Sequence, residues 1–311
     1  MKHQMQNSLF SNGNLIISGE YFVLTGAKAL AVPLRYGQSM KIEWINNSGN
    51  SIQWQTNELG IPWFRADINC EDLNITSSSD FETATGLVRL LKRIRNIKPD
   101  FFRKGRSYIV SCEIEFNLCW GWGSSSTLIS NLANYAGIDP FELNKLTSSG
   151  SGYDIAASLS PAPIFYQLKE KTHEINPVAF NPVFKNFIWF LYLGRKQNTS
   201  TSIENNLKSV EKNKTFGPVI TSLTEIIATG ENMEDFIRSI SEHEKIIAAT
   251  LNITRIKEKY FSDFEGEIKS LGAWGGDFAM VVSPLNETDI RHYFFNKGLE
   301  ILFGFDEIVK F

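Results

Sequence analysis

The residues best suited to chemistry begin with the loop Gly121-Trp-Gly-Ser-Ser-Ser126, which lies between a predicted strand and a predicted helix. Backbone N–H groups at a helix start bind anions, and glycines let phosphate oxygens approach the main chain closely. Serine hydroxyls at such a place can donate to phosphate or bind Mg²⁺. The loop is neither a GxxxxGK[ST] phosphate loop nor a GxGxxG fingerprint, and an ordinary strand-to-helix turn explains its composition equally well.

A carboxylate follows in residues 149–158, at Asp154. Small residues precede it and the apolar run Ile-Ala-Ala follows it, which predicts a position at the start of a buried helix. A buried carboxylate costs free energy unless it is paired or used in function. In phosphoryl transfer, such a group orients an acceptor hydroxyl and takes its proton. The alternative is that Asp154 only caps the helix.

A further glycine-rich loop, residues 271–277, leads into a predicted strand at 278–283. Its glycines would let the main chain approach a nucleotide or a substrate. A tight turn between a helix and a strand is the alternative interpretation.

The elements that must position these loops are a mixture of strands and helices. Alternating apolar residues and turn residues predict the strands, and the two strands on either side of residues 46–50 are expected to form a hairpin. Residues 176–186 carry two prolines and are expected to cross between two domains. The predicted strands are 15–18, 21–24, 40–45, 51–55, 108–116, 164–168, 187–193 and 278–283, and the predicted helices are 87–94, 128–135, one starting at Asp139, 202–210, 219–228, 233–249 and 253–260.

Composition excludes several classes of protein. The chain has 311 residues, of which 42% are hydrophobic and 21% charged, as in a globular protein of two domains. Its net charge of −3 gives no general attraction to nucleic acid or to anionic membranes. The longest apolar run has seven residues, far below the ~20 that span a bilayer, and no signal peptide is recognised at the start. We therefore expect a cytoplasmic protein without nucleic-acid or membrane partners.

Cysteine and histidine give no sign of a metal site. The three cysteines form no CxxC pair and are expected to be reduced. The four histidines are scattered without metal-binding spacing, and His243, in the sequence Ser-Glu-His-Glu, is expected on a helix surface.

Taken together and in this order, the motifs resemble those of the GHMP kinase superfamily. The first motif is Asn-Gly-Asn-Leu-Ile-Ile-Ser-Gly-Glu-Tyr-Phe-Val-Leu-Thr-Gly at residues 12–26, and the third is Leu-Gly-Ala-Trp-Gly-Gly-Asp at 271–277. The loop at 121–126 is similar to the second, which binds phosphate. Gly-Tyr-Asp-Ile-Ala at 152–156 resembles the catalytic aspartate segment. The resemblance covers essentially the whole chain and is closer to phosphomevalonate kinases than to galactokinases.

The resemblance implies an α+β fold of two domains, the GHMP kinase fold. The N-terminal domain, residues 1–182, is expected to resemble domain 2 of ribosomal protein S5 and to hold the phosphate loop and the catalytic aspartate. The C-terminal domain, residues 183–311, is expected to be ferredoxin-like. The resemblance also implies ATP and Mg²⁺ as cofactors, a small-molecule phosphate acceptor, and a monomer or homodimer.

Roles for individual residues follow from the resemblance. Asp154 is implied as the catalytic base or the carboxylate that orients the acceptor, with Glu20 and Asn14 beside it in the catalytic site, and Ser125 as a ligand of Mg²⁺. Binding of the ATP phosphates is implied for Gly121, Trp122, Gly123, Ser124, Ser125 and Ser126. Binding of the substrate is implied for Gly152, Tyr153, Arg195, Lys196, Gly275, Gly276 and Asp277.

Asn14 departs from the family pattern, which has lysine at this position. An amide cannot supply the positive charge that lowers the pKa of the aspartate or neutralises the moving phosphoryl group. Arg195 or Lys196 can take over this role, or they are surface charges. Trp122 and Trp274 also stand where relatives have smaller residues, and they either fill a core or stack on a base.

The leading hypothesis is therefore a kinase of a small metabolite, with mevalonate and phosphomevalonate as the first acceptors to test. A diphosphomevalonate decarboxylase, which shares the fold and the use of ATP, is one alternative. The other is a catalytically silent regulator that binds a nucleotide or a metabolite. Asn14 favours the regulator, whereas the intact phosphate loop and Asp154 oppose it.

Overall fold

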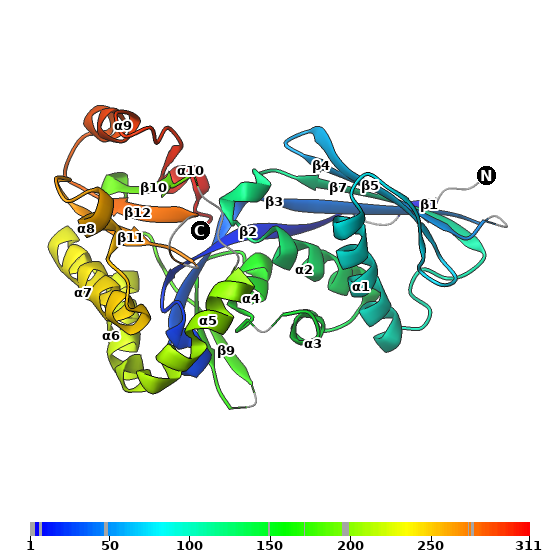
Figure 1. Ribbon diagram of the computed structural model, residues 1–311, viewed down its shortest axis with the longest axis horizontal. Coiled ribbons are helices and arrows are strands. Elements are labelled where there is room, and N and C mark those ends of the chain that lie inside the picture. Colours follow the sequence, from blue (N-terminus) through cyan, green and yellow to red (C-terminus); the bar gives the residue numbers. More distant parts are fainter. Residues whose placement is uncertain are drawn as a thin grey trace. The chain divides into compact units, whose positions relative to one another are not determined.

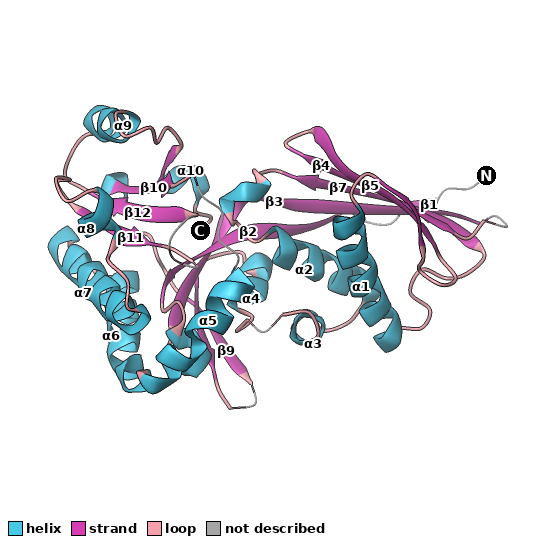
Figure 2. Cartoon of the chain, in the orientation of Figure 1, coloured by secondary structure: helices cyan, strands magenta, loops and turns pink. Residues whose placement is uncertain are grey.

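The computed structural model describes residues 4–5, 8–46, 49–148, 150–170, 172–194, 199–272, 274 and 277–311 (Figure 1). The chain forms two compact units, each assembled from several stretches of sequence. Unit 1 contains residues 1–13, 36–118 and 124–148, and unit 2 contains residues 14–35, 119–123 and 149–311. The domain bounds expected from the sequence, 1–182 and 183–311, stay a prediction. The mixed α+β class is confirmed (Figure 2).

Unit 1 is built on a sheet in which the strand order is β6-β5-β4-β7-β3. The strand β7 runs antiparallel to β3 and parallel to β4, so it lies between them. The predicted hairpin of residues 40–45 with 51–55 is therefore wrong, because β7 takes the hydrogen bonds that these two strands would have exchanged. The strands are β1 (Gln4–Met5), β2 (Leu9–Ser18), β3 (Ala29–Asn46), β4 (Ser51–Glu58), β5 (Ile61–Asn69), β6 (Ile75–Ser78) and β7 (Arg106–Ile114), of which β2 and β3 also extend into unit 2.

Unit 1 also contains three helices in the residues that the structure describes, namely α1 (Phe81–Ile97), α2 (Ser124–Ala136) and α3 (Pro140–Lys145) (Figure 1). The first begins after Asp80, whose carboxylate accepts a hydrogen bond from the backbone N–H of Thr83. The third begins after Asp139, which caps it in the same way, as its sequence predicts. The helix α1 buries an apolar stripe that includes Leu87, Leu91 and Ile94, and α3 buries Leu143, so the helices predicted at these two places are confirmed.

The second sheet belongs to unit 2 and has the strand order β11-β12-β10-β13, with every pair antiparallel. Helices lie between β10 and β11 and between β12 and β13, which gives the β-α-β-β-α-β order of a ferredoxin-like arrangement. Its strands are β10 (Ile188–Tyr192), β11 (Glu267–Ser270), β12 (Phe278–Val282) and β13 (Leu302–Gly304).

Helices cover both faces of this second sheet. Along β11, Ile268 packs into an apolar cluster with Ile290 of α9, whereas its neighbour Lys269 points to Glu244 of α7. Accordingly, α7 and α9 lie on opposite sides of the sheet (Figure 1). The helices of unit 2 are α4 (Tyr153–Leu159), α5 (Thr199–Lys212), α6 (Gly217–Thr229), α7 (Met233–Leu251), α8 (Ile256–Tyr260), α9 (Glu287–Phe295) and α10 (Phe305–Ile308).

The remaining part of unit 2 carries the first motif. The strands β8 (Ile164–Leu168) and β9 (His173–Pro177) form a hairpin that pairs with the start of β3. The strand predicted at 21–24 is wrong, because the chain forms the 3₁₀ helix η1 (Phe22–Thr25) there. Positive φ angles at Gly19, Tyr21 and Gly26 end the extended backbone on both sides of it. Short 3₁₀ helices also occur at η2 (Leu118–Trp120), η3 (Lys185–Phe187) and η4 (Lys214–Phe216).

Candidate active site

The predicted phosphate loop lies where the chain passes from unit 2 to unit 1. Gly121 and Gly123 belong to unit 2 and have φ angles of +68° and +78°, a region that favours glycine. The helix α2 begins at the next residue, Ser124. The first N–H groups of a helix have no intrahelical partner, and together with the helix dipole they attract anions. The loop therefore ends in the kind of helix start that its composition predicts.

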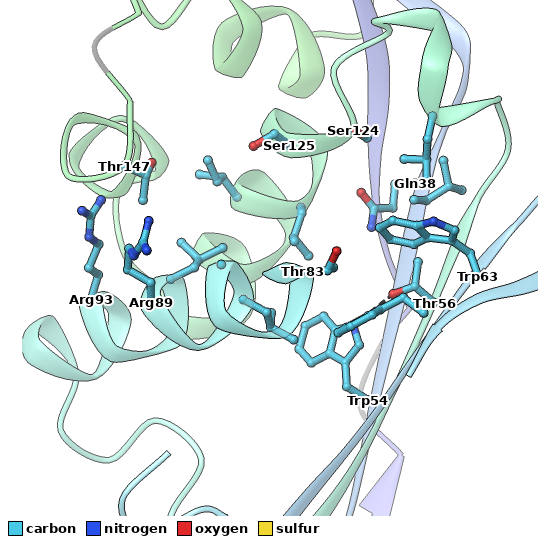
Figure 3. Close-up of a pocket in the computed structure, with 18 residues that line it drawn as sticks. Gln38, Trp54, Thr56, Trp63, Thr83, Arg89, Arg93, Ser124, Ser125 and Thr147 are labelled. Atoms are coloured by element: carbon cyan, nitrogen blue, oxygen red, sulfur yellow. Dashed lines mark hydrogen bonds between the residues drawn. The ribbon is translucent and has the colours of Figure 1, made fainter. Parts of the chain in front are cut away.

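A pocket of about 370 Å³ lies in unit 1 at this end of α2. In Figure 3, Trp54 and Trp63 from the strands lie on one side of the pocket, and Arg89 and Arg93 from α1 lie on the other. Polar groups from α2 and from neighbouring elements complete the wall, and they are Ser124, Ser125, Gln38, Thr56, Thr83 and Thr147.

The chemistry of this pocket suits a ligand with a flat ring and a negative charge. The indole of Trp63 is 44% exposed and offers a surface on which a ring can stack. Neither Arg89 nor Arg93 forms an ion pair with a residue that the structure describes, so both guanidinium groups can bind an anion. On α2, Ser125 is exposed whereas Ser126 is buried, so the hydroxyl of Ser125 is the more accessible of the two.

The predicted catalytic carboxylate, Asp154, lies in the first turn of α4, directly after Gly152 in a left-handed conformation. Its side chain is half-buried. Burial raises the pKa of Asp154 above its ordinary value of 3.8, although the backbone N–H groups of Asp154 and Ile155 oppose this shift. In the described part of the chain, no cation lowers the pKa of Asp154, so the effect of burial on this carboxyl is opposed by the two backbone N–H groups alone.

Three of the predicted site carboxylates gather around Tyr153 in unit 2. Burial raises the pKa of the Tyr153 hydroxyl, and the negative charges of Asp154, Glu20 and Asp277 raise it further. Asp154 comes from α4, Glu20 from the first motif, and Asp277 from the end of the third motif, directly before β12. A methyl group at Gly121 would lie 2.5 Å from Oδ2 of Asp277, so only glycine leaves room there for this carboxylate.

Glu20 differs from Asp154 because its carboxylate is already bound by the protein. It is 3% exposed, and Oε1 accepts hydrogen bonds from Nζ of Lys269 and, at 3.0 Å, from Nε1 of Trp274. Burial alone would raise the pKa of Glu20, but the charge of Lys269, the nearby His243 and the hydrogen bonds from Lys269 and Trp274 together hold this pKa below its ordinary value.

His243 is fully buried, so the prediction that it lies on a helix surface is wrong. Its Nε2 accepts a hydrogen bond of 3.0 Å from the backbone N–H of Gly19 and lies 3.6 Å from Oε2 of Glu20. Burial lowers the pKa of His243 to about 3, and the nearby charge of Lys269 lowers it as well. The imidazole is therefore neutral at physiological pH. The sequence does not single out Lys269, since a lysine in a four-residue strand gives no sign of its burial.

Asn14 and the two unusual tryptophans are buried in unit 2. The backbone N–H of Asn14 donates to the carbonyl oxygen of Trp122 at 3.1 Å, which ties the first motif to the phosphate loop. The indole of Trp122 packs between aromatic rings, with its centroid 5.4 Å from that of Phe278. Trp274 is 7% exposed and packs in the core beside Tyr21. These positions support the core-filling interpretation of both tryptophans.

Several predicted residues cannot be placed. Arg195, Lys196, Gly275 and Gly276 lie outside the described residues, and their assignment to the substrate site stays a prediction. Within the described ranges, no group of three or more His, Cys, Asp or Glu side chains could hold a metal ion. No helix in those same ranges is long and apolar enough to cross a membrane.

Comparison with solved structures identifies the fold. No family model and no curated protein sequence matches this chain. The mevalonate kinase of L. major in complex with R-mevalonate superposes with a TM-score of 0.69 at 13% identity, covering 98% of this chain and 96% of that one. The mevalonate kinase of Methanococcus jannaschii gives a TM-score of 0.69 at 14% identity, with 98% of both chains covered.

Phosphomevalonate kinases and decarboxylases share this fold. The Streptococcus pneumoniae phosphomevalonate kinase in complex with phosphomevalonate and AMPPNP matches with a TM-score of 0.66 at 16% identity, covering 95% of this chain and 98% of that one. A mevalonate diphosphate decarboxylase from Staphylococcus aureus matches with a TM-score of 0.53 at 11% identity, covering 99% of this chain and 95% of that one. The chain therefore has the fold of the GHMP kinases over almost its whole length.

Proposed function

We propose that this protein is a GHMP-type kinase that transfers the γ-phosphoryl group of Mg-ATP to a small metabolite. The observation that carries the proposal is the pocket at the start of α2, where Ser124 and Ser125 meet an exposed indole and two guanidinium groups that form no ion pair with the described residues. A nucleoside triphosphate has the two features that such a pocket selects, a flat ring and a chain of anionic groups. The shared fold supports the same assignment.

In this proposal, unit 1 binds the nucleotide. The indole of Trp63 stacks on the base, and the start of α2 binds phosphate oxygens through its backbone N–H groups. Mg²⁺ prefers oxygen ligands and usually keeps several waters together with substrate phosphates. The exposed hydroxyl of Ser125 fits that donor set, and the ion would neutralise charge on the phosphoryl group during transfer.

Asp154 accepts the proton of the acceptor hydroxyl. As the acceptor oxygen forms its bond to the γ-phosphorus, the bond between that phosphorus and the bridging oxygen of ADP breaks. The pKa of Asp154 is raised towards the working range of a general base, and its carboxylate is not neutralised by an ion pair with a residue of the described chain. Glu20, which is bound by Lys269, is less suited to that step.

We further propose mevalonate or phosphomevalonate as the acceptor. The support is that the L. major structure is a complex with R-mevalonate and the S. pneumoniae structure is a complex with phosphomevalonate and AMPPNP. Both proteins share the fold over nearly their whole length with this chain.

The test is ADP release from Mg-ATP with a panel of acceptors, namely mevalonate, phosphomevalonate, diphosphomevalonate, homoserine and simple sugars. We expect turnover with one acceptor and none in its absence. Release of CO₂ together with ADP would replace the kinase by a decarboxylase. Failure to bind any nucleotide would contradict the proposal as a whole.

A second candidate function, a silent nucleotide-binding regulator, is favoured by Asn14 alone. The variant Asn14→Lys separates the two candidates, because it restores the charge that the family has at this position. A kinase limited by the missing charge should gain rate in this variant. Tight ATP binding without turnover, in both the natural chain and Asn14→Lys, would favour the regulator.

A further inference from the structure

The turn between β2 and η1 has an unusual backbone. Gly19 has a φ angle of +88°, and a methyl group there would lie 2.5 Å from the carbonyl oxygen of Lys28. Tyr21 has a φ angle of +62° and a ψ angle of −53°, which a residue with a bulky side chain rarely adopts. Strained residues persist only where the surrounding structure holds them in place, and they gather at functional sites.

Three buried side chains hold this turn. Lys269 of β11 and Trp274 both donate hydrogen bonds to Oε1 of Glu20, and His243 of α7 accepts one from the N–H of Gly19. Lys269 and His243 are fully buried, and Trp274 is 7% exposed. The backbone of the turn is thus held at Gly19 by His243, which is 224 positions later in the sequence. The carboxylate of Glu20 is held by Lys269, which is 249 positions later.

The positive charge of Lys269 has two carboxylates as neighbours, Glu20 and Glu244. Lys269 has a second carboxylate nearby, since Oε1 of Glu244 lies 3.9 Å from its Nζ and accepts the N–H of Ser270 at 3.1 Å. A buried ammonium needs one anionic partner, and two ionised carboxylates would leave a net buried charge. Burial raises the pKa of Glu244 well above its ordinary value, whereas Lys269 lowers that of Glu20. Lys269 therefore pairs with Glu20, and Glu244 favours its neutral form more strongly than an ordinary carboxyl does.

The turn also lies near the start of the candidate catalytic helix. The charge of Glu20 acts on the hydroxyl of Tyr153, the residue that precedes Asp154 at the start of α4. Glu20 is therefore bound by Lys269 and Trp274 and is close enough to the beginning of α4 for its charge to be felt there.

We propose that Lys269, Trp274 and His243 form a positioning cluster that fixes the turn at Gly19–Tyr21 near the start of α4, the helix that carries Asp154. Glu20 is then a positioning residue that acts through its ion pair with Lys269. The inference rests on the proposed function for its effect on turnover, but not for its effect on the turn. A displacement of about 1 Å at a reacting group lowers rates by about 10²-fold, which sets the expected size of the effect.

The test compares Lys269→Met with the matched control Arg255→Met. Arg255 forms another buried ion pair of unit 2, at 2.8 Å from Glu267 of β11, the strand that also carries Lys269. Within the described residues, Arg255 forms no hydrogen bond or ion pair with Gly19 or Glu20. Each variant therefore removes one buried cation that is paired with a glutamate. Only Lys269→Met removes the cation that holds the turn.

Two readouts are used on the full chain. Hydrogen exchange followed by mass spectrometry should become faster in Lys269→Met for peptides covering 15–26 and 150–158, and should match the natural chain there in Arg255→Met. With the acceptor identified, kcat should fall by about 10²-fold in Lys269→Met while KM for Mg-ATP changes by less than about threefold. In Arg255→Met, kcat should be retained.

Unchanged exchange in both peptides of Lys269→Met would overturn the proposal, as would an equal loss of kcat in the control. Should Lys269→Met not fold, Trp274→Phe removes only the indole N–H that reaches Glu20 and should give the same changes to a smaller degree. Absence of turnover in the natural chain would contradict the proposed function. The positioning cluster would then be tested by hydrogen exchange in the two peptides alone.

Discussion

The pocket of unit 1 and the charged cluster of unit 2 use polar groups in opposite ways. Around the pocket, Ser125 and Arg89 are exposed, and the indole of Trp63 is 44% exposed. In the cluster, Lys269 and Glu244 are fully buried and bind other protein groups. Groups of the first kind can bind and release a ligand, whereas groups of the second kind hold fixed positions. Substitutions should therefore change affinity in unit 1, and rate and stability in unit 2.

The carboxylates of unit 2 show what a buried cation does. The pKa of Glu20, which is paired with Lys269, is lowered despite burial. The pKa values of Asp154 and Glu244 are raised by burial. Of these two, Asp154 is half-buried and can reach a substrate, whereas Glu244 is fully enclosed. A carboxylate that is accessible and unpaired with a cation is the one best placed to accept a proton.

The largest effect is expected from Asp154→Asn. It should lower kcat by about 10³-fold, because an amide cannot accept the proton, while the Kd for ATP stays within about twofold. It should also raise the melting temperature near neutral pH. A folded-state pKa above the ordinary value means that stability is lost as pH rises and Asp154 ionises, so removal of the charge restores it.

The matched control for this variant is Asp139→Asn, since Asp139 is another aspartate at the start of a short helix and asparagine caps equally well. It should leave both kcat and the melting temperature near those of the natural chain. Near-natural turnover in Asp154→Asn would remove this carboxylate from the mechanism.

The next effect compares two glutamates of the cluster by urea unfolding near neutral pH. Glu20→Gln removes the closer carboxylate of Lys269 and should lower the free energy of unfolding by about 3 kcal/mol, because the buried ammonium then keeps only Glu244, at 3.9 Å, as a carboxylate neighbour. Glu244→Gln mimics the protonated acid and keeps an oxygen for the N–H of Ser270, so it should cost less than about 1 kcal/mol. Equal losses would show that the charge assignment within the cluster is wrong.

A smaller effect concerns acid stability. The pKa of His243 falls from 6.5 to about 3 on folding, so the unfolded chain binds a proton that the folded chain excludes. Its contribution is complete above pH 6.5 and is lost as pH falls, by about 2 kcal/mol at about pH 5. The groups that face this imidazole are Glu20 and Lys269. In His243→Gln, the free energy of unfolding should change less between neutral pH and about pH 5. A slope equal to that of the natural chain would contradict this account.

The smallest effect tests the pocket of unit 1. Trp63→Ala removes the stacking surface and should weaken ATP binding by about tenfold in calorimetry. The control is Trp44→Ala, since Trp44 lies on β3 against Arg106, at 3.9 Å, and does not line the pocket. Equal affinity of Trp63→Ala and Trp44→Ala for ATP would place the nucleotide elsewhere.

Local signals in the sequence predict much of the fold. The cap at Asp139, the apolar stripe of α1 and the glycine turn before α2 each depend on a few neighbouring residues, and all three are confirmed. The hairpin prediction fails because turn residues at 46–50 say nothing about β7, which comes much later in the chain and separates the two strands.

The site is predicted less completely. Asp154, Glu20 and Asp277 carry motif signals, and the structure brings all three around Tyr153. Lys269 and His243 carry none, since their burial is decided by the packing of β11 and α7 against a turn that lies 249 and 224 positions earlier in the sequence. Contacts between residues so far apart in the sequence leave no pattern among the neighbours of either residue.

The most direct test of the central claim follows the label from Mg-ATP carrying a radioactive γ-phosphoryl group. The natural chain and Asp154→Asn are each incubated with mevalonate and with phosphomevalonate. We expect label on one acceptor with the natural chain and almost none with Asp154→Asn, although both bind ATP. Tight ATP binding by the natural chain without transfer of label to either acceptor or to any other member of the panel would contradict the central claim.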